Sequence, residues 1–210
     1  MTYREVDVMA NRIANVLVGM GYSRGSRIGL LLNNEIWSLP IDFACLKSGV
    51  ARVPLNSRLS QAEQAKMLTE TGVRLLIHGA DLTERALALA EELDGLTLLG
   101  LGEPQRAQDR NLFTEAERAR PTDPLVPVEP DDVMLVLYTS GTTGTLKAAQ
   151  HTQASWAAIA RNILTNLISP KRDDAMVHAA SLIHASGTFV LPYWLAGGRS
   201  IILPGFDPEQ

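Results

Sequence analysis

The sequence has little of several features that mark particular classes of protein. Of its 210 residues one is a cysteine, Cys45, so no disulfide can form within the chain, and we expect a reducing compartment. Cys45 stands in the apolar run 41–46, which favours a small buried side chain over a nucleophile. No apolar stretch approaches the roughly 20 residues that span a bilayer, and Arg4, Glu5 and Asp7 interrupt any signal peptide. We therefore expect a soluble, cytoplasmic protein, with peripheral membrane contact left open.

Strong charge of one sign is also missing. Lys and Arg number 19 against 23 Asp and Glu, a net charge of −4, and no basic run is present, so nucleic acid is a disfavoured partner. The four histidines, His78, His151, His178 and His184, show no metal-ligand spacing, so we assign no metal site. What the chain does have is 46% hydrophobic residues, enough for a sizeable core.

The hydrophobic pattern predicts strands that alternate with helices. Helices are expected to begin at capping boxes formed by Thr2 with Glu5 and by Ser60 with Glu63, and a further pair, Asp81 with Glu84, is expected to cap another helix. The other helices are expected at 35–47, 114–118, 156–167 and 186–195. Strands are expected at 27–32, 51–55, 73–78, 96–101, 133–137, 148–150, 175–180 and 200–203. This alternation indicates an α/β fold of layered, mostly parallel sheets flanked by helices.

One stretch has an unusual concentration of phosphate-binding chemistry. The strand 133–137 is apolar throughout, as expected for burial on both faces, and Tyr138 follows it directly. Next comes a run of hydroxyl side chains, glycines and a lysine: Thr139, Ser140, Gly141, Thr142, Thr143, Gly144 and Lys147. Glycines let the backbone approach a ligand, and hydroxyls, amides and a lysine bind anionic oxygens. The plain alternative is a solvated turn.

Two better-known phosphate motifs are excluded by spacing. A nucleoside-triphosphatase P-loop needs four residues between its glycines and Gly-Lys-Ser/Thr at its end, whereas Gly141 and Gly144 are separated by two. The dinucleotide fingerprint fails because Gln105 stands where its third glycine belongs.

Residues 138–148 instead resemble the signature Y-T-S-G-T-T-G-x-P-K-G of the adenylate-forming superfamily. The match departs at Leu146, where the signature has proline, and at Ala148, where it has glycine. The resemblance continues at 46–56, similar to the family's L-K-x-G-x-x-x-V-P-L, and at 2–5, similar to T-Y-x-E. Residues 181–187 resemble P-L-x-H-x-x-G, whose histidine lies near the acyl carboxylate. Among subfamilies the chain is most like the acyl-CoA synthetases.

The resemblance implies a function and a set of binding residues. A member joins a small carboxylic acid to ATP, with Mg²⁺, and then transfers the acyl group to coenzyme A. Thr139 to Gly144 and Lys147 would hold the ATP phosphates, and His184 would lie at the substrate carboxylate. No catalytic residue is expected within this chain, because the chemistry needs no protein nucleophile and the family's catalytic lysine follows later.

The resemblance also implies that these 210 residues are an N-terminal portion of an AMP-binding domain. We expect residues 20–170 to form a nearly complete α/β subdomain, and 1–19 with 171–210 to belong to an incomplete second one. The chain alone is then expected to lack activity, and to self-associate through exposed apolar surface near 175–203. The alternative is a non-catalytic nucleotide- or acyl-binding module of the same fold.

Overall fold

The computed structural model describes residues 1–140, 146–183 and 185–205. Within them the main sheet has seven strands in the order β5-β4-β3-β1-β2-β6-β7, parallel except for the antiparallel pair β6 and β7. The strands are β1 (Arg27–Leu31), β2 (Ala51–Pro54), β3 (Leu75–His78), β4 (Thr97–Gly100), β5 (Arg110–Asn111), β6 (Val133–Ser140) and β7 (Leu146–Thr152). The predicted mostly parallel α/β fold is confirmed.

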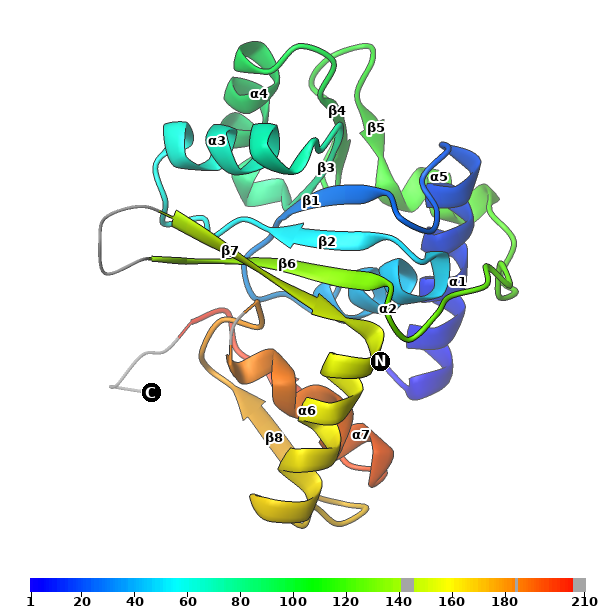
Figure 1. Cartoon of the computed structure of the whole chain (residues 1–210). Helices are drawn as coiled ribbons and strands as arrows, with labels where there is room; N and C mark the ends of the chain where they lie inside the picture. Colours follow the sequence, from blue (N-terminus) through cyan, green and yellow to red (C-terminus); the bar gives the residue numbers. More distant parts are fainter. Residues whose placement is uncertain (141–145, 184, 206–210) are drawn as a thin grey trace.

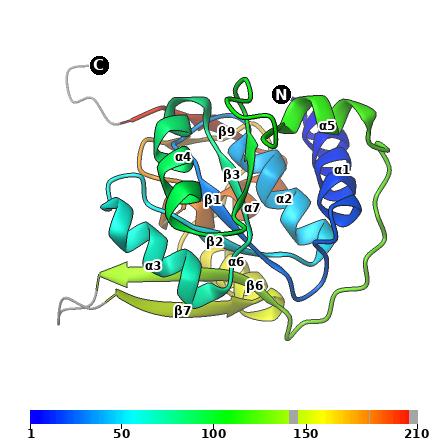
Figure 2. The same cartoon turned by 90° about the horizontal axis from the view of Figure 1, so that it is seen from above.

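Helices cover both faces of this sheet, as Figures 1 and 2 show. Alternate residues of the central strands point to opposite faces: Leu75 and Ile77 join the core under one helix layer, and Leu76 joins the core under the other. The first layer comprises α1 (Tyr3–Gly19), α2 (Ser38–Ser48) and α5 (Leu112–Arg118). The second comprises α3 (Gln61–Thr71) and α4 (Thr83–Glu92).

A second unit lies beside the carboxyl end of β7 (Figure 1). It contains a two-stranded parallel sheet, β8 (Ala175–His178) and β9 (Arg199–Ile202). It also contains α6 (Gln153–Asn166), the 3₁₀ helix η2 (Ala185–Phe189) and α7 (Val190–Leu195). The assignment of 1–19 to this second unit stays a prediction, although the buried face of α1 packs in the main core.

Two of the three predicted caps are confirmed. Thr2 and Ser60 each accept the backbone N–H of a glutamate three residues on, and each glutamate side chain accepts the cap residue's own N–H. The third is wrong. A 3₁₀ turn, η1 (Ala80–Leu82), precedes α4, and the side chain of Asp81 accepts a hydrogen bond from Asn33 instead of capping the helix.

Two helices also differ from prediction. The one expected at 35–47 begins later, at Ser38, because Asn34 and Glu35 belong to the loop after β1. The one expected at 186–195 is divided into η2 and α7, and Val190 begins the α-helical part. Across the described ranges, every helix falls short of the length and apolar content that a bilayer crossing requires.

Candidate functional site

The hydroxyl- and glycine-rich stretch joins β6 to β7 in an antiparallel hairpin. Ser140 pairs with Leu146, and Thr139 pairs with Lys147. Directly opposed residues of an antiparallel pair project their side chains to the same face, so the side chains of Thr139 and Lys147 lie on one face of the hairpin at the base of the turn. Both residues are exposed. Gly141, Thr142, Thr143 and Gly144 lie outside the described residues, as does the side chain of Ser140.

The two departures from the signature fall where the hairpin tolerates them. Ala148 pairs with Tyr138 inside β7, and among described residues Leu125 is the one non-glycine residue with positive φ. A glycine is therefore not required at 148. Leu146 is the first residue of β7, an edge strand, which is also a position that accepts proline.

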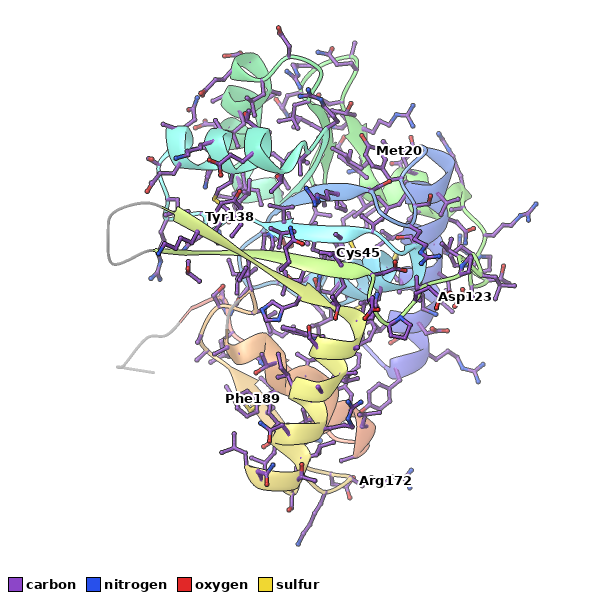
Figure 3. All side chains as sticks on the ribbon, in the orientation of Figure 1. Met20, Cys45, Asp123, Tyr138, Arg172 and Phe189 are labelled. Carbon is purple, nitrogen blue, oxygen red and sulfur yellow. The ribbon has the colours of Figure 1, made fainter. Side chains whose placement is uncertain are left out.

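Tyr138 connects β6, the strand that leads into the turn, to α3. Its ring packs in the core beneath α3, and its hydroxyl donates a 3.0 Å hydrogen bond to Oε2 of Glu70 on that helix (Figure 3). Burial raises the pKa of Tyr138 to about 12, and the hydrogen bond to Glu70 adds to the shift. The phenol therefore stays protonated at neutral pH, and the position of β6 is fixed relative to α3.

Lys147 is available to an anion. Among the described residues it forms no ion pair, whereas Lys66 pairs with Glu70 and Lys47 pairs with Asp7 and Asp123. An exposed ammonium group beside a hydroxyl, at the base of a turn, can bind phosphate oxygens.

The segment that resembles the carboxylate-binding motif begins after β8. His184 itself lies outside the described residues. Residues near it in the chain form hydrogen bonds with Asn34, which lies in the loop after β1 of the main sheet. Nδ2 of Asn34 donates to the carbonyls of Ala180 at 3.0 Å and Leu203 at 3.1 Å, and Oδ1 accepts from the Leu182 amide at 2.9 Å. Asn34 thus joins the carboxyl ends of β8 and β9 to the main sheet.

His178 is a second residue that holds this segment. It is fully buried, with Nδ1 2.9 Å from the Ser186 hydroxyl and Nε2 3.1 Å from the Ser200 hydroxyl. Burial lowers the pKa of His178, so the imidazole is neutral at pH 7. Neither His178 nor Asn34 belongs to a motif that the sequence analysis identified. The available signal was position alone: Asn34 follows the predicted strand 27–32, and His178 lies within the predicted strand 175–180, of which it is the last residue in the observed β8. Parallel sheets place functional residues at the carboxyl ends of their strands.

The carboxylates of Glu35 and Asp81 lie near each other, in the segments that follow β1 and β3. Burial, and then the negative charge of Asp81, raise the pKa of Glu35 to about 7. Cys45 is buried in α2, as the apolar run 41–46 predicts, and burial raises the pKa of its thiol to about 12, so the thiol stays protonated at neutral pH. Within the described part of the chain, no three His, Cys, Asp or Glu residues are grouped closely enough to hold a metal ion.

The chain is similar to known proteins over its whole length. A family model described as AMP-binding enzyme matches residues 1–210. A feruloyl-CoA synthase from an Amycolatopsis species is 36% identical over 212 residues, which cover 99% of this chain and 40% of that protein. The chain therefore spans less than half the length of this curated relative.

Solved structures of similar proteins superpose on nearly the whole chain. The inhibitor-bound N-terminal domain of FACL13 from Mycobacterium tuberculosis superposes with a TM-score of 0.86 at 28% identity, over 99% of this chain and 51% of that one. ATP-bound MatB from Rhodopseudomonas palustris superposes with a TM-score of 0.84 at 28% identity, over 100% of this chain and 41% of MatB.

Proposed function

The chain belongs to the AMP-binding enzyme family, and from that premise we propose that it is part of an ATP-dependent ligase that activates a carboxylic acid and passes it to coenzyme A. The feruloyl-CoA synthase and a long-chain-fatty-acid–CoA ligase of Mycobacterium tuberculosis, both similar to this chain, are CoA ligases, which supports acyl activation as the chemistry. The observation that carries the proposal is the hairpin stem, which sets Thr139 opposite Lys147 at the base of the glycine-rich turn.

In the proposed reaction a carboxylate oxygen attacks the α-phosphorus of ATP. The bond to the β-phosphate oxygen breaks, and pyrophosphate leaves with the added negative charge. The proposed role of the turn, from Thr139 to Gly144 with Lys147, is to hold the β- and γ-phosphates as this charge develops. Donors fixed in advance stabilise such a leaving group electrostatically. The coenzyme A thiolate then attacks the acyl carbon and displaces AMP.

The carboxylate would be held by His184. Asn34 and His178 support this role, because they fix the residues on both sides of position 184 to the main sheet and to β9. Mg²⁺ is proposed to arrive with the ATP phosphates and to neutralise part of their charge. The described residues contain no cluster that would hold it, so no residue of this chain is assigned to the metal.

Competition between anions tests the phosphate assignment. Labelled ATP·Mg²⁺ should bind the purified chain saturably and be displaced by pyrophosphate, because the turn is proposed to hold the β- and γ-phosphates. AMP, which lacks both phosphates, should displace it more weakly. Displacement by AMP with no effect of pyrophosphate would contradict the assignment.

We also propose that the 210 residues bind the nucleotide without completing the reaction. The proposed phosphate- and carboxylate-binding residues, Thr139 to Gly144, Lys147 and His184, lie in this chain, which covers 40% of the feruloyl-CoA synthase that it resembles. Pyrophosphate exchange into ATP, measured with a mixture of carboxylic acids, should stay at background. Robust exchange by the purified chain would refute this part of the proposal. The cytoplasmic location stays a prediction.

A further inference from the structure

A cavity of about 120 Å³ lies between the main sheet and the second unit. Strands β1 and β6 contribute Leu30 and Leu135, α2 contributes Leu39 and Phe43, and α7 contributes Val190. An apolar cavity of roughly 150 Å³ holds one benzene molecule. The space therefore suits a compact body of about one six-membered ring.

One wall of this apolar cavity carries a charged pair. Arg52 on β2 forms an ion pair with Asp42 on α2, and both residues line the cavity. The Arg52 side chain is 5% exposed and the Asp42 side chain is 38% exposed. Arg52 lies on the same face of the sheet as Pro54, whereas Val53 points to the opposite core under α3 and α4.

The hydrogen-bonding capacity of Arg52 is only partly used by the described residues. A guanidinium group has five N–H donors, and among the described residues Asp42 is its one charged partner. Its Nε is buried and has no hydrogen-bond partner in that part of the chain. Buried donors are almost always satisfied. Because Nε is enclosed by protein atoms, the terminal N–H groups of Arg52, which lines the cavity, are the donors that an acceptor in the cavity can reach.

We propose that this cavity binds a compact apolar molecule that carries a hydroxyl group at one end. The hydroxyl oxygen accepts a hydrogen bond from Arg52, and its proton is donated to the Asp42 carboxylate. The pair has no net charge, and a carboxylate at this end would meet the negative charge of Asp42. A neutral group that both accepts and donates is therefore the best match.

The cavity also adjoins the proposed carboxylate site. Ile183 and Gly187, which flank position 184, contribute to its lining. If the proposed function holds, on which this second step rests, the acid to be activated has a ring-sized apolar body and a hydroxyl at the end away from its carboxylate. The hydroxyl site itself does not depend on that function.

The hydroxyl site is tested with p-cresol and toluene, which differ by one hydroxyl group. Nuclear magnetic resonance titration of the 210-residue chain, followed at the indole N–H of the cavity residue Trp156, should give about tenfold or greater preference for p-cresol, as expected for hydrogen bonds to charged groups. In Arg52→Met/Asp42→Leu the preference should vanish. Apolar replacement of a whole buried pair commonly preserves folding.

A matched control removes an ion pair far from the cavity. Arg106→Met/Asp109→Leu deletes another partly buried pair and should keep the preference for p-cresol. Equal affinity for p-cresol and toluene in the original chain would overturn the hydroxyl site. So would a preference that persists in Arg52→Met/Asp42→Leu.

The link to acyl activation has its own test. 4-Hydroxybenzoate should bind more tightly than benzoate by a similar factor, and Arg52→Met/Asp42→Leu should remove the difference. If p-cresol is preferred over toluene but the two acids bind alike, the assignment to the acid is overturned while the hydroxyl site stands. Displacement of ATP by pyrophosphate is measured separately, so a failure of the proposed function is distinguishable from either result.

Discussion

At the scale of single residues, the hydroxyl of Tyr138 connects the strand before the turn to α3. Tyr138→Phe removes its hydrogen bond to Glu70 and keeps the packed ring. We expect the free energy of unfolding to fall by about 1–2 kcal/mol, measured by urea denaturation. Tyr22→Phe is a matched control, because no hydrogen bond of the Tyr22 hydroxyl is found among the described residues. Equal stability of Tyr138→Phe and the original chain would show that the bond contributes nothing.

Glu35 should make stability depend on pH. Its folded pKa, about 7, lies above the ordinary value of 4.5, so the folded state keeps a proton that the unfolded state has lost. Stability should therefore fall as pH rises from about 4.5 to about 7, and the loss should be complete above that range. Because water screens this partly exposed carboxylate, we expect a loss on the order of 1–3 kcal/mol.

Glu35→Gln tests this dependence directly. The difference in unfolding free energy between pH 5 and pH 8 should shrink by the same amount, because glutamine has no proton to lose. Urea denaturation at the two pH values measures it. An unchanged difference in Glu35→Gln would assign the pH dependence to other groups.

At the scale of secondary-structure elements, Asn34 joins two sheets that share no strand. Asn34→Ala deletes its bonds to the carbonyls of Ala180 and Leu203 and to the Leu182 amide. We expect a loss of about 1–3 kcal/mol and faster amide hydrogen exchange in β8 and β9. Asn33→Ala is the matched control, since the exposed Asn33 side chain forms its hydrogen bonds among the described residues with Asp81 of η1 and Ser57 of the loop after β2, and none with β8 or β9. Equal exchange in the two variants would contradict the role of Asn34.

The helix caps and the contacts of Asn34 show which structural features could be predicted from the sequence and which could not. Capping boxes at Thr2 and Ser60 and the apolar strand before Tyr138 depend on neighbours within a few residues, so their patterns were readable. The partners Ala180, Leu182 and Leu203 lie 146 to 169 residues from Asn34, and no local pattern records them. Asp81 failed as a cap for the same reason, because Asn33 of another loop engages its carboxylate.

The candidate site likewise has one part that was predicted from the sequence and another that was not. Phosphate binding by the turn was predicted from the residues of the turn and stays a prediction, whereas the hairpin stem at its base is observed. The Arg52–Asp42 pair was not foreseen. An arginine inside an otherwise apolar strand was its one signal in the sequence, and the pairing depends on how α2 docks against β2.

At the scale of the whole molecule, the second unit leaves large apolar side chains exposed: Leu167, Val177, Leu195, Ile201 and Leu203. Such a surface favours association. We expect the weight-average mass from light scattering to rise with concentration. Val177→Thr/Ile201→Thr, on the two paired strands, should reduce the rise, and Val128→Thr, an exposed valine of the connecting segment, should not. A strictly monomeric chain at high concentration would contradict this prediction.

The central claim is that the turn between β6 and β7 binds the phosphates of ATP. Isothermal titration of ATP·Mg²⁺ into the chain, Lys147→Ala and the control Lys171→Ala, another surface lysine, tests it most directly. Loss of a charge-assisted contact should raise the Kd of Lys147→Ala by about tenfold or more, and Lys171→Ala should bind as the original chain does. Equal affinity in all three, or no binding by the original chain, would contradict the account.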